Sequence, residues 1–227
     1  MQIKMDITSE TRSVRDVVYE KLKEAILMGD YKPGFHLNER QLAQQFMIST
    51  TPLKEALRHL EQEGLVVTRS RVGSFVSEDV MNSIEEINLV RSAVEGVAAR
   101  LAATKIDEDE SIQLGQVIKE MELYTKERNP EKVLEVNTYF HKLIRTFAKN
   151  NYVFKQIEAI RSFDLGPRNK TLSNFDELDR AFNEHKLIYK KIIMRDPDGA
   201  EKAVRAHIDR STRFVLEGRI IDGEKTK

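Results

Sequence analysis

The sequence of 227 residues contains no cysteine. Without cysteine the chain can form neither a disulfide nor a thiolate metal site, which is typical of proteins from a reducing cytosol. The N-terminus lacks the apolar core of a signal peptide, and no apolar run approaches the length of a membrane span. These absences predict a cytoplasmic protein with no membrane partner.

The chain also lacks an excess of charge of either sign, because 37 basic residues are balanced by 37 acidic residues. Bulk charge therefore gives no sign of a nucleic-acid partner. Any DNA-binding function has to come from the placement of a few basic side chains. The length suggests two domains, each large enough for a core of its own.

A short amphipathic helix is predicted to follow Ser49 and to end at Gly64. Its apolar residues recur with helical spacing and predict one buried stripe, formed by Leu53, Ala56, Leu57 and Leu60. Ser49 stands where an N-cap belongs, and Pro52 lies in the first turn, where a missing N–H costs nothing. The opposite side of the helix is free to meet a partner and carries Thr50, Thr51, Lys54 and Arg58.

The neighbouring segments turn this helix into part of a larger motif. A longer helix is predicted over residues 12–28, and a second short helix over 38–46. Two β-rich runs, 65–69 and 74–77, flank a basic tip that contains Arg71 and Gly73. Two short helices joined by a tight turn and followed by a hairpin predict a winged helix-turn-helix.

This region resembles the winged helix-turn-helix of GntR-type bacterial transcription regulators. The resemblance rests on LNERQLA at 37–43, STTPLKEALRHLE at 49–61, EGLV at 63–66 and GSFV at 73–76. It implies that DNA is contacted by Arg40, Ser49, Thr50, Thr51, Lys54, Arg58, Arg71 and Gly73. The family commonly has arginine where Thr50 and Lys54 stand, and lysine lacks the planar fork that reads guanine with two hydrogen bonds. We therefore expect double-stranded DNA binding with an altered base preference.

Beyond residue 78 the apolar period becomes helical and stays so, which predicts three segments: a flexible N-terminus (1–11), the winged domain (12–78) and an all-α domain (79–227). About six helices are expected, beginning near Ser83, Asp107, Pro130, Tyr152, Ser173 or Asn174, and Asp196. The fourth is expected to end near Phe163, before a loop at 164–167. The fold class is mainly α, with a helical bundle at its C-terminal side.

Three histidines are set among apolar residues on separate predicted helices of this bundle: His141, His185 and His207, with Asn137 one turn before His141. Imidazoles that project inward from three helices can meet and bind zinc, nickel, iron or manganese. On spacing alone, ordinary hydrogen-bonded core histidines are the favoured interpretation, and a metal site is the alternative.

The second half resembles the FCD domain, the ligand-binding domain of the FadR-type branch of GntR regulators. The resemblance rests on LVRSAVEGVAARLA at 89–102, NTYFHKLI at 137–144, EHKLIY at 184–189 and AVRAHI at 203–208. It implies a divalent metal, zinc first among the candidates, held by Asn137, His141, His185 and His207, together with a small carboxylate effector. An aspartate is usual where Asn137 stands, and a neutral amide is the weaker ligand.

Two arginines are candidates for holding that effector. The resemblance implies that Arg91 faces the carboxylate, because a guanidinium can hold a carboxylate with two hydrogen bonds. Arg145, one turn beyond His141, is a lesser candidate. On the residues alone, Arg91 and Glu95 also fit a surface ion pair at i and i+4.

Together these features predict a homodimeric transcriptional regulator of a metabolic operon that binds a pseudo-palindromic operator, as a repressor or, less often in such proteins, as an activator. A metal-dependent enzyme with a fused DNA-binding domain is the alternative, because three histidines with open positions also activate water. No obvious general base, nucleophile elbow or phosphate loop accompanies the histidines. A nucleoid-associated DNA protein is a third reading, but it leaves the bundle without a purpose.

Overall fold

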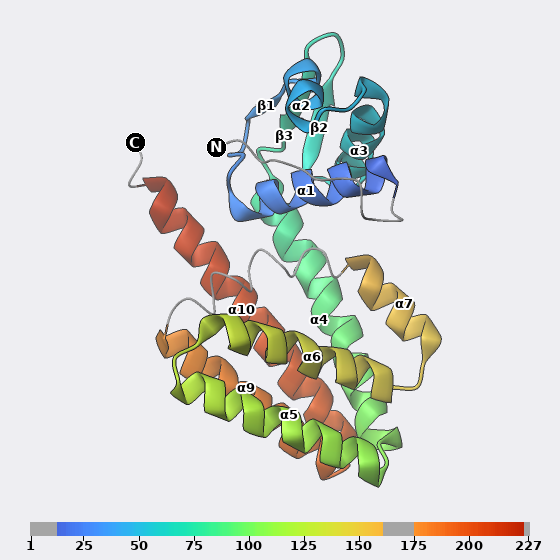
Figure 1. Ribbon diagram of the computed structural model, residues 1–227, viewed down its shortest axis with the longest axis vertical. Coiled ribbons are helices and arrows are strands. Elements are labelled where there is room, and N and C mark those ends of the chain that lie inside the picture. The colour runs from blue at the N-terminus through green and yellow to red at the C-terminus, as the bar shows by residue number, and fades with distance from the viewer. Residues whose placement is uncertain (1–12, 161–174, 225–227) are drawn as a thin grey trace. The chain divides into compact units, whose positions relative to one another are not determined.

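The computed structural model describes residues 13–160 and 175–224. The chain divides into two compact units, Met1–Glu86 and Ile87–Lys227 (Figure 1). The predicted flexible N-terminus, the predicted helix end near Phe163, the loop at 164–167 and the predicted start at Ser173 or Asn174 lie outside the described residues. No described helix has the length and apolar character needed to cross a membrane.

The first unit combines helices with a small antiparallel sheet. Its elements are α1 (Val14–Met28), β1 (His36–Leu37), α2 (Glu39–Phe46), α3 (Thr50–Gln62), β2 (Val66–Arg69) and β3 (Gly73–Val76). The strand order is β1-β3-β2, and Ser74 of β3 is paired with Leu37 on one side and Thr68 on the other. The predicted hairpin is therefore present, and β1 adds a third strand to it.

Local sequence explains where these helices begin. The Asn38 side chain accepts hydrogen bonds from the backbone N–H groups of Arg40 and Gln41, and so caps α2. Ser49 occupies the N-cap of α3 as expected, although its side chain makes no capping hydrogen bond. The predicted stripe of α3 is buried, and each large apolar side chain in it contributes about 1.5–3 kcal/mol to the free energy of unfolding.

A buried charge joins α1 to the end of α3. Lys23 is only 1% exposed, and its Nζ donates to Tyr19 Oη over 2.7 Å and to Glu63 Oε1 over 2.9 Å. Burial lowers the pKa of Lys23, and the nearby charge of Glu63 works against this. A charge is tolerated here because both of these oxygens accept hydrogen bonds from it.

The second unit is helical. Its elements are α4 (Val80–Lys105), whose first turns belong to the first unit, α5 (Glu108–Lys126), α6 (Pro130–Phe147), α7 (Asn151–Ile160), α9 (Phe175–Ile193) and α10 (Pro197–Glu224). The predicted mainly α fold is confirmed. Helix α4 begins three residues earlier than the expected Ser83, because Val80 and Ile84 are buried and Ser83 Oγ donates to Gly64 O.

The core of the bundle lies where α5 packs against α6 and α9, and α9 against α10 (Figure 1). Its buried side chains come from several helices and include Leu114, Phe140, Ile188, Val204 and Ile208. Phe140 also contacts the rings of His141 and His185 edge-on. The apolar core thus continues directly into a group of buried polar side chains.

Candidate metal centre and nucleic-acid interface

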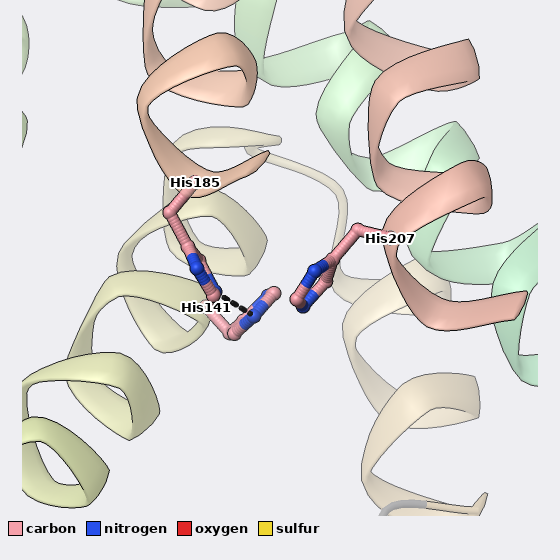
Figure 2. Close-up of side chains that lie close together, drawn as sticks. All are labelled: His141, His185 and His207. Atoms are coloured by element: carbon pink, nitrogen blue, oxygen red, sulfur yellow. Dashed lines mark hydrogen bonds between the residues drawn. The ribbon is translucent and has the colours of Figure 1, made fainter. Parts of the chain in front are cut away.

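The three predicted histidines meet inside the bundle. His141 comes from α6, His185 from α9 and His207 from α10, and all three are buried (Figure 2). One ring nitrogen from each lies within 4.8 Å of the others, and the Nε2 atoms of His141 and His185 are 3.1 Å apart. Two nitrogens bound to one ion at about 2.1 Å each would be separated by roughly 3.0–3.4 Å. The cluster therefore has the dimensions of a metal site.

Outer hydrogen bonds define which nitrogens of two rings point inward. His185 Nδ1 donates to the backbone oxygen of Ala181, and His207 Nδ1 lies 2.7 Å from Glu184 Oε2. A carbonyl or carboxylate oxygen only accepts, so Nδ1 carries the proton in both rings. The neutral rings then hold their lone pair on Nε2, which is the tautomer that a metal-binding histidine needs.

Asn137 is the fourth predicted ligand. It lies one turn before His141 on α6 and is buried, and its Oδ1 has no hydrogen-bond partner among the described residues. An unsatisfied buried acceptor costs about 1–3 kcal/mol, which a bound ion would offset. Three neutral nitrogens and an amide oxygen fit a divalent metal of the zinc or nickel type.

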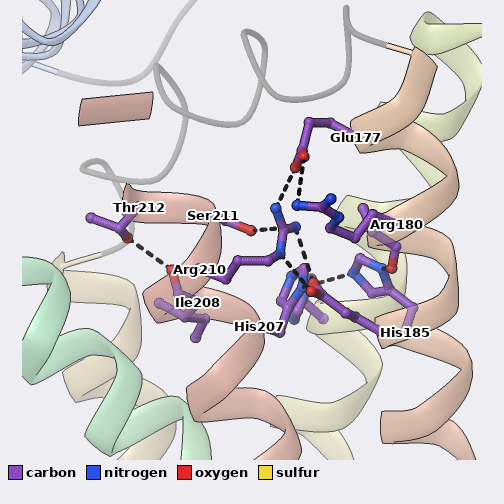
Figure 3. Close-up of polar contacts among 11 residues, drawn as sticks. Glu177, Arg180, His185, His207, Ile208, Arg210, Ser211 and Thr212 are labelled. Atoms are coloured by element: carbon purple, nitrogen blue, oxygen red, sulfur yellow. Dashed lines mark hydrogen bonds and ion pairs between the residues drawn. The ribbon is translucent and has the colours of Figure 1, made fainter. Parts of the chain in front are cut away.

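A carboxylate supports the cluster from outside. Glu184 also accepts from Arg210, with Nη2 and Oε2 3.0 Å apart, and Arg210 extends to Glu177 (Figure 3). Burial acts to raise the pKa of Glu184, but hydrogen bonds from His207 and Arg210 outweigh it and hold the pKa below its usual value. Glu184 is therefore poised to remain a carboxylate beside the ring of His207.

The two predicted effector arginines lie on α4 and α6, and both are buried. Arg91 Nη1 donates to Asn88 Oδ1 over 2.9 Å, and Arg145 Nη1 lies 3.2 Å from Glu95 Oε1. The reading of Arg91 and Glu95 as a surface ion pair is wrong, because both side chains face the interior. Asn137, His141 and Arg145 follow one another at four-residue spacing on α6, which places the second guanidinium one turn from the histidines.

The predicted DNA contacts lie on the surface of the first unit. Ser49, Thr50, Thr51, Lys54 and Arg58 are exposed along one side of α3, and Arg40 is exposed on α2. Lys54 forms a loose ion pair with Glu39 at 3.6 Å. Within the described parts of the chain, the side chains of Arg40, Arg58 and Arg71 make no ion pair or hydrogen bond, so their charges are available to a phosphate or a base edge.

The tip of the wing has a constrained backbone. Arg71 has φ 61° and Gly73 has φ 131°, a conformation that favours glycine. A Cβ at Gly73 would lie 2.6 Å from His36 Nε2. Glycine at this position therefore lets the wing approach β1 while Arg71 stays exposed at the tip.

Glu184, Arg210 and Glu95 also belong to these polar groups, although none of the three was predicted as a member. Glu184 directly precedes His185, and Arg210 follows His207 by one helical turn. This proximity to the candidate ligands is the signal that could have pointed to the first two. Nothing local indicated that Glu95 would meet Arg145, 50 residues away in the chain.

Comparison with known proteins finds two family profiles. The one described as the FCD domain matches residues 86–210, and the one described as bacterial regulatory proteins of the gntR family matches residues 14–76. The chain is 27% identical over 203 residues to the uncharacterized HTH-type transcriptional regulator YdhC of Bacillus subtilis, covering 88% of this chain and 91% of that one.

Two further relatives have more specific names. The HTH-type transcriptional repressor RspR of Escherichia coli is 25% identical, with 91% of each chain covered. A probable D-xylose utilization operon transcriptional repressor of Paenarthrobacter nicotinovorans is 29% identical, with 90% of this chain and 91% of the other covered. Among solved structures, E. coli McbR/YncC matches with a TM-score of 0.65 at 22% identity over 92% of this chain and 100% of that chain, which shows a shared fold.

Proposed function

We propose that this chain, which belongs to the gntR family of bacterial regulatory proteins and carries an FCD domain, is a repressor of a metabolic operon controlled by a small carboxylate. The family makes it a ligand-responsive, DNA-binding transcriptional regulator rather than an enzyme. Two of its relatives are named as repressors. We assign DNA binding to residues 12–78 and effector binding and dimerisation to 79–227, and we place the protein in the cytoplasm.

On DNA, we infer that two copies bind one pseudo-palindromic operator. Helix α3 of each copy would enter a major groove, with Lys54 and Arg58 toward the DNA, while Arg71 at the wing tip would approach the adjacent minor groove. Joining two reading heads in a homodimer raises the affinity well beyond that of one head. A change in the distance between the two DNA-binding units would lose much of this additional affinity.

The effector site is proposed at the histidine cluster. His141, His185, His207 and Asn137 would hold a divalent ion, first among the candidates zinc, which supplies a Lewis-acidic point for a carboxylate oxygen. Arg145 and Arg91 would bind the same carboxylate through their guanidinium groups. Arg91 lies on α4, whose first turns belong to the DNA-binding unit, so that a ligand at Arg91 would act on a helix that both units share.

The proposal rests mainly on one observation: three buried imidazoles bring nitrogens within 4.8 Å of one another, and one helical turn before His141 lies a buried amide oxygen that has no partner among the described residues. Core histidines that only pack and donate hydrogen bonds do not require this convergence of lone pairs. A metal ion explains both the convergence and the unsatisfied oxygen.

The test is the metal content of the full-length protein, purified without chelators or a histidine tag. We expect about one equivalent of metal per chain in the wild type and none in the His185→Ala variant. The His36→Ala variant, which removes an exposed histidine of the other unit, is the matched control and should match the wild type. A wild type without metal after reconstitution with zinc, nickel or manganese would overturn the metal centre.

The same proteins test the regulation. An operator selected from random duplexes should be retained by both wild type and His185→Ala in a gel-shift assay. A panel of small carboxylates, screened by thermal shift and then added to the gel shift, should release only the wild type. Release of both proteins by the same carboxylate would show that the effector binds elsewhere.

A further inference from the structure

The candidate ligand from α10 is held by a side chain from α9. Glu184 Oε2 accepts a hydrogen bond from His207 Nδ1 over 2.7 Å, and the next residue in the chain is His185, itself a candidate ligand. Helix α9 therefore provides the imidazole of His185 directly and orients the imidazole of His207 through Glu184. Carboxylate–histidine pairs of this kind fix the ring and its tautomer at metal sites.

Glu184 is itself fixed by a fork of hydrogen bonds. Arg210 Nε lies 2.5 Å from Glu184 Oε1, and Arg210 Nη2 lies 3.0 Å from Oε2, so both carboxylate oxygens accept hydrogen bonds. The third guanidinium nitrogen, Nη1, donates to Glu177, near the beginning of α9. The carboxylate of Glu184 consequently has little freedom to turn away from His207.

The charge of Glu184 also matters to this cluster. The candidate ligands are three imidazoles and the amide of Asn137, so the set carries no negative charge of its own. A divalent ion buried among neutral ligands is less stable than one with a compensating anion nearby. Glu184 is an anion joined to the ligand set by a direct hydrogen bond.

We propose that Glu184 and Arg210 are positioning residues of the metal centre. Glu184 holds His207 with Nε2 directed inward and supplies the negative charge that Asn137 does not, and Arg210 holds Glu184 in this position. The inference rests on the proposed metal centre. The competing explanation is that Glu184 and Arg210 only hold α9 and α10 together. Their loss would then lower the stability of the protein without a specific effect on its metal affinity.

The experiment measures the affinity of the full-length protein for Co²⁺ and Zn²⁺, added alone, by competition with a chelating indicator. Glu184→Gln keeps the size of the side chain and removes its charge, and it should weaken metal binding roughly 10–100-fold. Arg210→Gln should also weaken metal binding. The matched control is Glu201→Gln, because Glu201 accepts from Arg205 and Arg100 and contacts no histidine in the described structure.

Two measurements distinguish a role in orienting His207 from a purely structural contact between α9 and α10. The first is the visible spectrum of the Co²⁺ form, which should change in Glu184→Gln, since the coordination of His207 is altered. The second is thermal unfolding of the metal-free proteins with a chelator present, which measures only what the contacts between α9 and α10 contribute to stability. Metal affinity equal to that of the wild type in Glu184→Gln, together with an unchanged spectrum, would overturn the positioning role even if stability fell.

A compensating variant tests the charge argument. Asn137→Asp places a carboxylate among the ligands, so adding it to Glu184→Gln should restore at least tenfold of the lost affinity. Absence of any rescue would overturn the charge part of the proposal. A wild type that binds neither ion would overturn the metal centre and this inference with it. A wild type that binds metal no more tightly than Glu184→Gln, with the same Co²⁺ spectrum, would overturn the inference and leave the metal centre standing.

Discussion

Arg145 and Glu95 form an ion pair inside the helical unit, with 3.2 Å between Nη1 and Oε1 and side chains that are only 2% and 5% exposed. The Nε of Arg145 is also buried and has no hydrogen-bond partner among the described residues. Such a pair is fully desolvated, so its two members depend on each other. It also stands one turn from His141, where an incoming carboxylate would compete with Glu95 for the guanidinium.

Replacing Glu95 by alanine should lower the free energy of unfolding by about 3–5 kcal/mol, because the charge of Arg145 stays buried without its carboxylate. Urea unfolding of the metal-free protein measures this. The double variant Glu95→Leu with Arg145→Met should recover much of the loss, since it buries apolar groups instead. If the double variant is as unstable as Glu95→Ala, the unpaired charge of Arg145 is not the cause of the lost stability.

The same double variant addresses function. It removes a predicted effector contact and leaves the histidines in place, so it should still bind metal and operator but no longer respond to the carboxylate. Metal analysis and a gel shift with the carboxylate measure the two properties. A full response from this variant would remove Arg145 from the effector site.

Exchange of Glu63 for alanine should destabilise the first unit by about 3–5 kcal/mol, because it removes a carboxylate that accepts from the buried Lys23. Adding Lys23→Met should return part of this loss. Thermal and urea unfolding of the full chain are suitable measurements. Additive losses in the two variants would argue against coupling between these side chains.

Lys23 should also give stability a dependence on alkaline pH. Burial lowers its pKa in the folded protein below the ordinary 10.5, so the unfolded chain holds this proton more tightly. The contribution of Lys23 to stability is then present above the unfolded-state pKa and lost as the pH falls through the folded-state pKa. Relative to Lys23→Met, the free energy of unfolding of the wild type should rise as the pH approaches 10.5 from below. The same pH dependence of this free energy in both proteins, measured by urea unfolding, would contradict it.

Arg58→Ala should weaken operator binding roughly 10–100-fold, the effect of removing one specific arginine contact. Arg58 is exposed and makes no ion pair within the described residues, so the fold should be unaffected. The control is Lys126→Ala, which removes an exposed charge from the helical unit. Unchanged retention of Arg58→Ala in a salt-titrated gel shift would exclude the proposed docking of α3.

Gly73→Ala should strain the wing, because alanine resists φ 131°, and its Cβ would lie 2.6 Å from Nε2 of the exposed His36 ring, which would have to move aside. We expect a stability loss of about 1–3 kcal/mol and weaker operator binding. Val72→Ala, at the neighbouring exposed tip position, is the control and should change both properties little. Equal effects of the two variants would mean that the backbone of Gly73 has no special role.

The secondary structure of the first unit could be predicted closely because its signals are local. Asn38 caps α2 through the backbone of the next turn, and the stripe from Leu53 to Leu60 buries one side of α3, both within a few residues of sequence. The third strand was missed because two residues, His36 and Leu37, are too few to show an alternating pattern. They become a strand only by pairing with β3.

For the candidate metal centre, the types of the residues and their place on apolar helical faces can be read from the sequence alone. It did not determine that His141 and His185, 44 residues apart, would bring their Nε2 atoms to 3.1 Å. Nor did it determine that Glu95 would turn to Arg145. Helical spacing shows which side chains share one face of a helix. Which buried charges and lone pairs contact one another is decided only by the packing of separate helices. The reason is that a buried polar group is destabilising unless another group replaces the hydrogen bonds that it made to water.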